Sequence, residues 1–167
     1  MKTQTEDAVR ALGHLALGTR LKRLGDRLQA HAQVILDEAG VPVPASHLPP
    51  LAALKRGGAM AVGDLSRALG VTQPGVTRMT AALERAGLVR SGATEDDRRA
   101  RIVALSPAGR QLLARLERRT FPLIEAAVRE ACSDASGHFL AALAALEDAL
   151  EETPLAARTI RLATGAR

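Results

Sequence analysis

The apolar residues near the start of the chain recur at intervals of three, four or seven, the spacing of one face of an α-helix. This pattern covers residues 7–39 and predicts one long helix. Gly40 is expected to end it, and residues 41–44 (VPVP) are expected to be an extended connector, because proline disfavours helical backbone in the residue before it. A second, short helix is predicted from about Pro49 to Gly57, since prolines are tolerated in a first turn.

Two short helical patterns follow, at residues 62–69 and 73–85. Only Gly70, Val71 and Thr72 separate them, which is the spacing of a helix-turn-helix. Gly70 can adopt the left-handed backbone that ends one helix, and Thr72 can cap the next with its hydroxyl group. The sequence therefore predicts a helix-turn-helix in the middle of the chain.

The pattern then changes from helical spacing to that of strands. Residues 88–91 and 101–105 are strand-like and flank a polar loop, residues 92–100, so a β-hairpin is predicted. Ser106-Pro107 is expected to open a further helix that continues to about Ala131.

In that helix Pro122 can introduce a kink. A last helix, capped by Asp134 or Ser136, is predicted to run through Leu150 and to stop before Pro154. The pattern assigns no structure to the final dozen residues.

Length and composition narrow the function classes. The 167 residues suit one compact domain, and 47% hydrophobic with 25% charged residues is typical of a soluble globular protein. No stretch has the roughly 20 apolar residues that span a bilayer, and no signal peptide is recognisable, so a cytoplasmic protein without membrane contact is expected. One cysteine and four scattered histidines offer no metal-ligand spacing. Since no catalytic motif is present either, neither a cofactor nor an enzyme is expected.

The net charge of +5 is unevenly distributed. Residues 41–119 hold 13 Lys and Arg against 6 Asp and Glu, whereas residues 120–167 hold 4 against 7. The positive charge thus accompanies the helix-turn-helix and the hairpin. Of the 23 basic residues 20 are arginine, which suits bidentate phosphate contact, although an arginine-rich genome would produce the same bias.

The helix over residues 73–85 has one apolar side and one small polar side. Its apolar stripe comprises Val76, Met79 or Thr80, and Leu83, and the opposite side carries Gln73, Thr77, Arg78 and Ala81. A helix that enters a major groove about 12 Å wide needs small residues for close approach and a few hydrogen-bonding groups. Gly75 and Ala81 meet the first need. An ordinary amphipathic helix with a solvated outer face remains the alternative.

The predicted hairpin loop ends in a run of acids and arginines. Asp97, Arg98 and Arg99 are the candidates there for DNA contact. Arginine fits a narrow minor groove, and the carboxylate of Asp97 could orient such an arginine. The alternative is a solvated run of charges without a partner.

Several motifs in this order together resemble the multiple-antibiotic-resistance regulator (MarR) family, over about residues 6–152. They are VGDLSRALGVTQPGVTR at residues 62–78, LERAGLV at residues 83–89, DRR at residues 97–99 and VALSPAGR at residues 103–110. Residues 15–24 and 154–156 also resemble a branch in which some members carry a C-terminal acetyltransferase domain. The chain ends at Arg167, so no room for that domain is expected.

The resemblance implies a mainly α (α+β) fold, a winged helix-turn-helix with flanking long dimerisation helices. The winged helix is expected at residues 46–105 and the dimerisation region at residues 1–45 and 106–167, in one intertwined domain. It also implies a homodimeric regulator, a repressor, that binds a pseudo-palindromic operator in double-stranded DNA and is released by a small-molecule effector. By position in the motifs, the DNA-binding residues would be Thr72, Gln73, Gly75, Thr77, Arg78, Asp97 and Arg99.

Two features qualify this expectation. Where relatives have a bulky aromatic residue, this chain has His47-Leu48-Pro49-Pro50, and it contains neither Trp nor Tyr, so an aromatic-lined effector pocket is not expected. Cys132 has no basic neighbour in sequence, which favours an incidental thiol over a redox switch. The alternative function is a dimeric winged-helix adaptor, or the detached partner of an acetyltransferase, without sequence-specific DNA binding.

Overall fold

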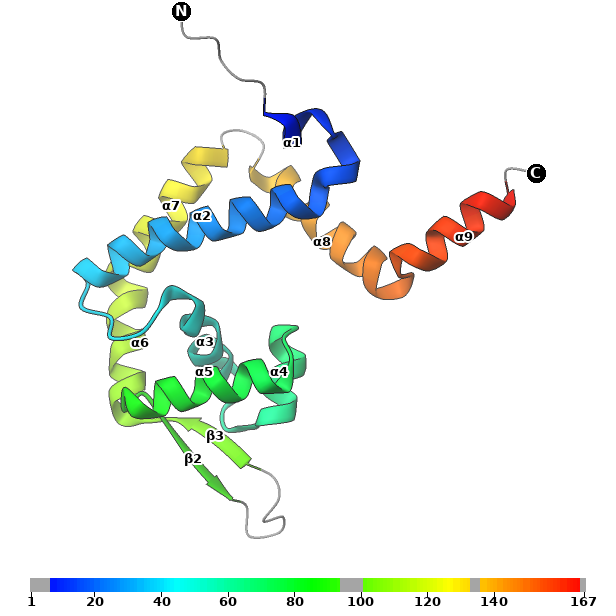
Figure 1. Cartoon of the computed structure of the whole chain (residues 1–167). Helices are drawn as coiled ribbons and strands as arrows, with labels where there is room; N and C mark the ends of the chain where they lie inside the picture. The colour runs from blue at the N-terminus through cyan, green and yellow to red at the C-terminus, as the bar shows by residue number, and fades with distance from the viewer. Residues whose placement is uncertain (1–6, 94–100, 133–135, 166–167) are drawn as a thin grey trace, which may run out of the picture. The chain divides into compact units, whose positions relative to one another are not determined.

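The computed structural model describes residues 7–93, 101–132 and 136–165 (Figure 1). These residues form helices and one small sheet, and the chain divides into two compact units, Met1–Pro122 and Leu123–Arg167. The first unit contains the helix-turn-helix and the sheet. The predicted fold class, mainly helical with a winged helix-turn-helix, is confirmed.

The prediction of one continuous helix over residues 7–39 is wrong. The segment consists of α1 (Ala8–Ala11), the 3-10 turn η1 (Gly13–Ala16) and α2 (Leu17–Glu38). Gly13 has a φ of 56°, in the left-handed region, and an α-helix cannot continue through that conformation. The helical spacing of the apolar residues therefore extends across a break in the helix.

The winged-helix elements follow the sequence prediction closely. After the non-helical residues 41–44 come the 3-10 turn η2 (Ala45–His47) and α3 (Leu48–Gly57), with prolines in its first turn. The helix-turn-helix consists of α4 (Val62–Leu69) and α5 (Gln73–Arg85), with the predicted bounds. Gly70, at a φ of 62°, ends α4 in the left-handed conformation.

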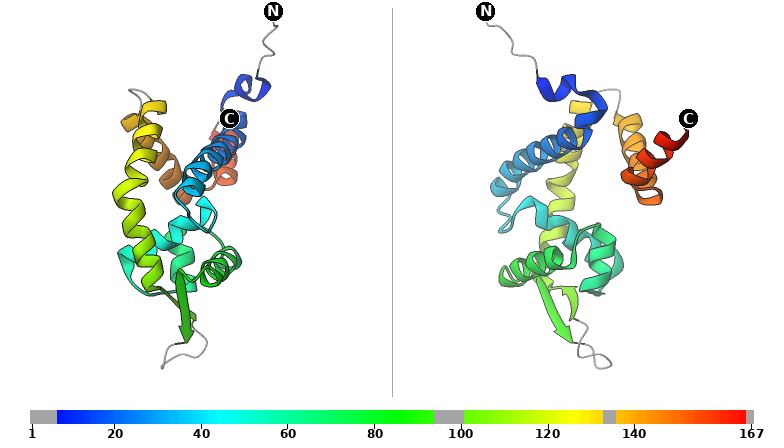
Figure 2. Two further views of the ribbon diagram at one scale, coloured as in Figure 1. Left: turned by 90° about the vertical axis from the view of Figure 1, so that its left-hand side faces the viewer. Right: turned by 45° about the vertical axis from the view of Figure 1, so that its right-hand side comes forward.

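Three antiparallel strands form the sheet, in the order β1-β3-β2. The predicted hairpin is confirmed as β2 (Val89–Ala93) and β3 (Arg101–Leu105), in which Val89 pairs with Leu105. The sequence analysis did not find β1 (Met60–Ala61), because two residues are too few to show an alternating pattern. In both views of Figure 2 the β2–β3 hairpin projects from the neighbouring helices.

The core of the first unit lies where these helices meet the sheet. Leu51 and Leu54 of α3, Leu65 of α4, and Val103 of β3 are buried there. Further buried side chains come from the end of α2, from the connector after it and from α6 (Pro107–Arg119): Leu36, Val41, Val43, Leu112, Leu113 and Leu116. Strand β3 of the hairpin therefore packs against the helices of the first unit.

The predicted helix over residues 106–131 is two helices, α6 and α7 (Phe121–Cys132), so its continuity was predicted wrongly. Pro122 has no N–H to donate to the carbonyl group four residues earlier, and its ring clashes with that carbonyl, which explains a break here. The predicted last helix is confirmed as α8 (Ser136–Glu152). Ser136 is its first residue, and the other candidate cap, Asp134, lies outside the described residues.

A further helix, α9 (Leu155–Gly165), was not predicted. It follows Pro154 and occupies the segment to which the sequence pattern assigned no structure. Arg158 joins it to the preceding helix, because its Nε donates to the carbonyl oxygen of Thr153 over 2.9 Å and its Nη2 donates to that of Ala149. The end of α8 is thereby capped by a side chain of α9.

Candidate nucleic-acid interface

Helix α5 begins with a cap made by its own sequence. Thr72 is the N-cap residue, and its hydroxyl group accepts a hydrogen bond from the N–H of Gly75 over 3.4 Å. On the inner side Val76, Thr80 and Leu83 are each 0% exposed, whereas Met79 is half-buried. Thr80 therefore belongs to the core, and its hydroxyl group is satisfied by donating to the carbonyl oxygen of Val76 over 2.9 Å. The sequence pattern had left Met79 and Thr80 as alternatives.

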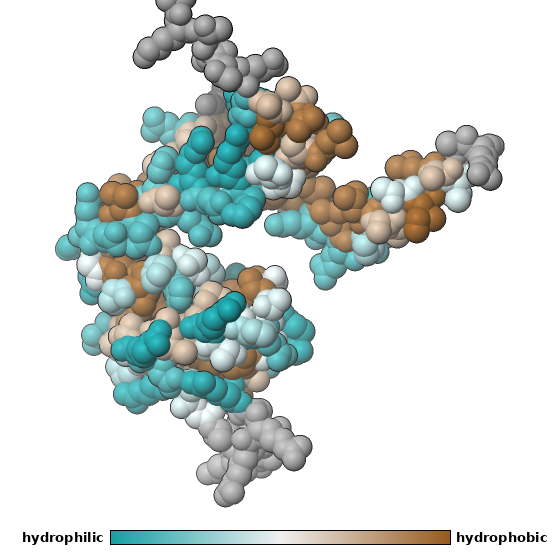
Figure 3. Space-filling model, viewed as in Figure 1, coloured by the Kyte–Doolittle hydropathy of each residue, from teal (hydrophilic) through white to brown (hydrophobic). Residues whose placement is uncertain are grey.

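The predicted polar face of α5 is exposed. Gln73, Thr77 and Arg78 are exposed, and Ala81 is half-buried. Figure 3 shows hydrophilic side chains over the side of α5 that faces the viewer. The structure therefore brings the candidate residues of this helix together on one accessible surface.

Two of these residues also have roles within the helix. The Thr77 hydroxyl donates to the carbonyl oxygen of Gln73 over 2.9 Å, so its oxygen is free to accept rather than to donate. A Cβ added at Gly75 would lie 3.3 Å from Oγ1 of Thr72, so the small residue at this position also suits the cap. The exposed guanidinium of Arg78 forms no ion pair with a carboxylate of the described residues.

Two hydrogen bonds between Ser66 of α4 and Val71 hold the turn between α4 and α5. The Ser66 hydroxyl donates to the carbonyl oxygen of Val71 over 2.5 Å, and the Val71 N–H donates to the carbonyl oxygen of Ser66 over 3.2 Å. A Cβ added at Gly63 of α4 would lie 3.3 Å from Nε2 of Gln73. Gln73 thus sits against the first turn of α4 and at the start of the exposed face.

The hairpin corresponds to the wing of the predicted fold. Asp97, Arg98 and Arg99, the predicted DNA contacts of its loop, lie outside the described residues and stay predictions. Within the described strands, Arg90 on β2 and Arg101 on β3 are exposed. From the sequence, Arg101 belongs to the run of acids and arginines at the end of the hairpin loop, but neither it nor Arg90 was predicted as a DNA contact.

One acidic residue on α5 was also missed. The carboxylate of Glu84 accepts a hydrogen bond from the N–H of Ser91 on β2 and pairs with Arg101 on β3. The sequence does contain a sign of this, because Glu84 follows the buried Thr80 by four residues and so lies on the inner stripe of the helix. A charged residue on such a stripe needs a partner.

The base of the hairpin is fixed to α6. The Ser106 hydroxyl donates to the carbonyl oxygen of Gly87 over 2.6 Å and accepts from the N–H of Gly109 over 2.9 Å. The Ser106 N–H donates to the carbonyl oxygen of Leu88 over 3.0 Å. A Cβ added at Gly109 would lie only 2.1 Å from that same oxygen, so only glycine allows this approach. The end of α5, both strands and α6 are therefore held at one joint.

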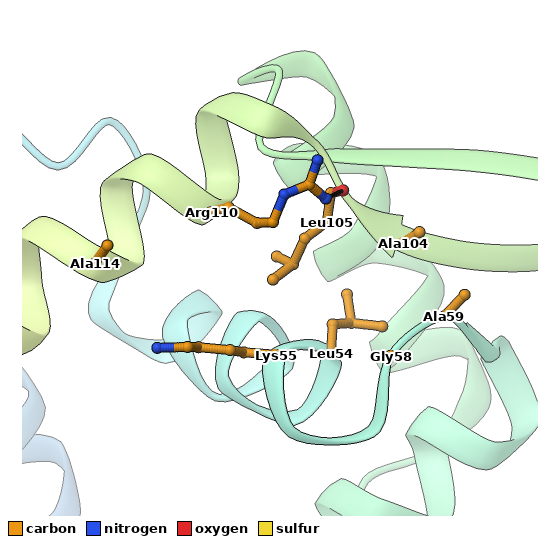
Figure 4. A pocket seen from close by; sticks show the side chains of 8 residues that line it. All are labelled: Leu54, Lys55, Gly58, Ala59, Ala104, Leu105, Arg110 and Ala114. Carbon is orange, nitrogen blue, oxygen red and sulfur yellow. Dashed lines mark hydrogen bonds between the residues drawn. The ribbon is translucent and has the colours of Figure 1, made fainter.

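An apolar groove of about 330 Å³ lies between α3, β3 and α6 (Figure 4). Leu54 and Leu105 form much of its wall, and the basic side chains of Lys55 and Arg110 stand at its edge. Both cations already have partners, because Lys55 pairs with Glu117 and Arg110 Nη1 donates to the carbonyl oxygen of Leu105 over 2.8 Å. The groove therefore offers little free charge to an anionic ligand.

Metal binding and membrane insertion find little support in the described residues. They contain no group of three or more His, Cys, Asp or Glu side chains arranged to hold a metal ion. None of their helices combines the length and apolarity needed to cross a bilayer. Cys132 is a half-buried free thiol.

Comparison with known proteins supports the same fold. Residues 40–100 match the model of the MarR family, and this segment contains the helix-turn-helix and the first strand of the hairpin. No curated protein sequence matches the chain significantly.

Solved structures of low sequence identity share the architecture. One such structure is of BpsR from Bordetella bronchiseptica and is described by the regulation of its DNA binding by 6-hydroxynicotinic acid. It is 23% identical to this chain, with a TM-score of 0.66 over 82% of this chain and 94% of that one. A mutant of MarR from E. coli complexed with operator DNA is 19% identical, with a TM-score of 0.63 over 78% and 94%. PcaV from Streptomyces coelicolor in complex with its natural ligand is 18% identical, with a TM-score of 0.65 over 80% and 95%.

Proposed function

We propose that this protein is a MarR-type transcriptional regulator that binds a pseudo-palindromic operator in double-stranded DNA as a homodimer. The observation that carries the proposal is the exposed small, polar face of α5 within a winged helix whose residues 40–100 match the MarR family. A helix of this kind can approach base edges closely, because small residues lie beside its few hydrogen-bonding side chains on the exposed face.

In this proposal α5 is the recognition helix. The exposed Arg78 is suited to donate to guanine O6 and N7 or to a phosphate group, and Gln73 can hydrogen-bond an adenine or a phosphate. Thr77 contributes an acceptor, while Thr72 and Gly75 keep the start of the helix open to the DNA backbone. The remaining proposed contacts come from the hairpin loop, in which Arg98 and Arg99 would enter the minor groove and Asp97 would orient Arg99.

The homodimer is supported by apolar side chains that the described structure leaves exposed. In the second unit Leu140, Leu155, Ile160 and Leu162 are each exposed by more than 60% of their surface. Figure 3 shows these apolar stretches on α8 and α9. In the proposal the regions over residues 1–45 and 106–167 pair with those of a second copy. The two recognition helices would then enter successive major grooves, about 34 to 36 Å apart.

We propose that the regulator acts as a repressor and that a small molecule releases it from DNA. The support comes from relatives of the same fold, since one is described by the regulation of its DNA binding by 6-hydroxynicotinic acid and another as a complex with its natural ligand. Such a ligand must bind one spacing of the recognition helices better than the other. The coupling free energy for effects of this type is about 1 to 3 kcal/mol.

The proposal is tested by selecting duplexes from a random library and measuring affinity for the selected sequence. Arg78→Ala should weaken binding by about 1 to 3 kcal/mol if Arg78 contacts a base. Arg56→Ala, which removes the same charge from an exposed position on α3 outside the proposed dimer regions, should leave affinity almost unchanged. With about four phosphates neutralised per subunit, the logarithm of the affinity should fall with the logarithm of salt concentration with a slope near −7.

Equal affinities for parent and Arg78→Ala, or an affinity that salt does not change, would contradict this function. That outcome would favour the alternative, a dimeric adaptor or the detached partner of an acetyltransferase. In an adaptor the exposed face of α5 would be solvated or would contact another protein.

A further inference from the structure

One carboxylate on the recognition helix contacts both strands of the hairpin. Oε1 of Glu84 accepts a hydrogen bond from the N–H of Ser91 on β2 over 3.2 Å. Oε2 of the same residue pairs with Nη2 of Arg101 on β3 over 2.5 Å. Ser91 lies two residues before the described end of β2, and Arg101 is the first residue of β3. Glu84 therefore holds the hairpin on both strands beyond its base.

The hydrogen-bond pattern of the sheet explains why the Ser91 N–H needs this acceptor. The Leu88 carbonyl oxygen accepts from the Ser106 N–H, so these two residues occupy a hydrogen-bonded position at the end of the antiparallel ladder. Residues in register alternate between bonded and non-bonded pairs, and this alternation turns the Ser91 N–H away from β3. Since β2 is an edge strand of the sheet, that N–H faces no further strand of the described residues. The carboxylate of Glu84 supplies the missing partner.

The pair contributes little to global stability. The side chains of Arg101 and Glu84 are 43% and 38% exposed, and ion pairs with that much solvent contact are worth little. Their geometry restricts movement instead, because a bridge from one rigid helix to two strands limits the swing of the hairpin relative to that helix. Such a restraint is valuable where two elements must meet a ligand in a fixed relation.

We propose that Glu84 is a positioning residue that sets the angle of the wing against the recognition helix, so that both approach DNA as one preformed unit. It does so without contacting DNA itself, and its negative charge is tolerated close to the DNA because Arg101 neutralises it. The expected gain in DNA binding rests on the proposed function, whereas the contacts of Glu84 are present in the protein without DNA.

The first experiment uses the free protein. Amide hydrogen exchange at Ser91 should be at least about ten times faster in Glu84→Ala than in the parent, because the amide loses its acceptor. Asp64→Ala removes the same charge from α4, where Asp64 pairs only with Arg67 of its own helix among the described residues, and should leave Ser91 unchanged. Glu84→Gln retains an acceptor oxygen and should keep much of the protection. Unchanged exchange at Ser91 in Glu84→Ala would overturn the proposal, whether or not the protein binds DNA.

The second experiment measures binding to the DNA that the parent selects. Glu84→Ala should bind about 5 to 30 times more weakly than Asp64→Ala, since the wing must then be ordered at the moment of binding. Its base preference within each half-site should be retained, whereas hydroxyl-radical protection of the flanking minor groove should be lost. If Ser91 exchanges faster but both variants bind equally and protect the same nucleotides, Glu84 holds the hairpin without positioning it for DNA, and the proposal fails.

If the parent selects no DNA at all, the proposed function fails instead. The Ser91 measurement still decides whether Glu84 restrains the hairpin. The two failures are thus distinguishable.

Discussion

The two compact units of the chain differ in how they treat their apolar side chains. Every buried residue of the described structure lies at or before Thr120, and all of them belong to the first unit. The described residues of the second unit include no buried one, although α8 and α9 are rich in leucine and alanine. The first unit encloses a core of its own, whereas the second unit leaves large apolar side chains exposed.

In the proposed regulator this difference separates the part of the chain that binds DNA from the part that forms the dimer. The winged helix has caps, a turn and a joint at Ser106 that fix its elements without any partner. In the proposed homodimer the second unit buries its apolar residues against a second copy of the chain. Its contribution to stability should therefore depend on protein concentration, and that of the first unit should not.

The largest effect is expected in the core of the winged helix. Leu65 is 0% exposed, so Leu65→Ala should reduce the free energy of unfolding by about 2 to 5 kcal/mol, through lost burial and the cavity left behind. Urea denaturation followed by circular dichroism measures this loss. The loss should be the same at low and high protein concentration. A loss below 1 kcal/mol would show that the first unit does not depend on this core.

An intermediate effect is expected in the second unit, at the proposed dimer contact. Leu140 is 65% exposed on α8, so Leu140→Asp should barely alter the isolated chain but should raise the dimer dissociation constant about 10- to 100-fold. Sedimentation equilibrium measures that constant. His138→Asp, at an exposed polar position of the same helix, is the control. Equal association by the two variants would remove Leu140 from the interface, and a monomeric parent at micromolar concentration would remove the dimer.

The smallest effect concerns the start of the first unit. The hydrogen bond from Arg23 holds the pKa of Asp7 below its ordinary value of 3.8, and Asp7 also caps α1 by accepting from the N–H groups of Val9 and Arg10. A carboxyl group with a lowered pKa stabilises the fold above pH 3.8, and this contribution is lost as pH falls through the lowered value. The amide resonances of Val9 and Arg10 should shift over that acid range. Asp7→Asn should abolish the shift, and a titration that survives this substitution would assign it to another group.

The sequence predicted the winged helix better than the helices around it, for a physical reason. Gly70, Thr72 and Pro74 each mark an end of a helix by a local conformational requirement, so α4 and α5 have the expected bounds. Gly13 was missed as a break because a glycine inside a helical pattern is also tolerated. The sequence pattern treated Pro122 as a kink rather than as a break between α6 and α7, and it assigned no structure to the residues of α9.

The candidate site was predicted in part for similar reasons. The 3.6-residue period placed Gln73, Thr77 and Arg78 on the outer face of α5, but it could not choose between Met79 and Thr80 for the inner one. The bridge made by Glu84 joins residues 17 positions apart and could be found only with the register of the strands in place. The contacts proposed for Arg98 and Arg99 stay predictions.

The most direct test of the account is the spacing of the DNA contacts. Duplexes selected by the purified protein from a random library should contain a pseudo-palindrome, and hydroxyl-radical footprinting should show two half-sites whose centres are about 10 to 10.5 base pairs apart, or a multiple of that distance. This result would place two copies of α5 on one face of the duplex. Selection of no common sequence, or occupancy of a single half-site by one copy of the chain, would contradict it.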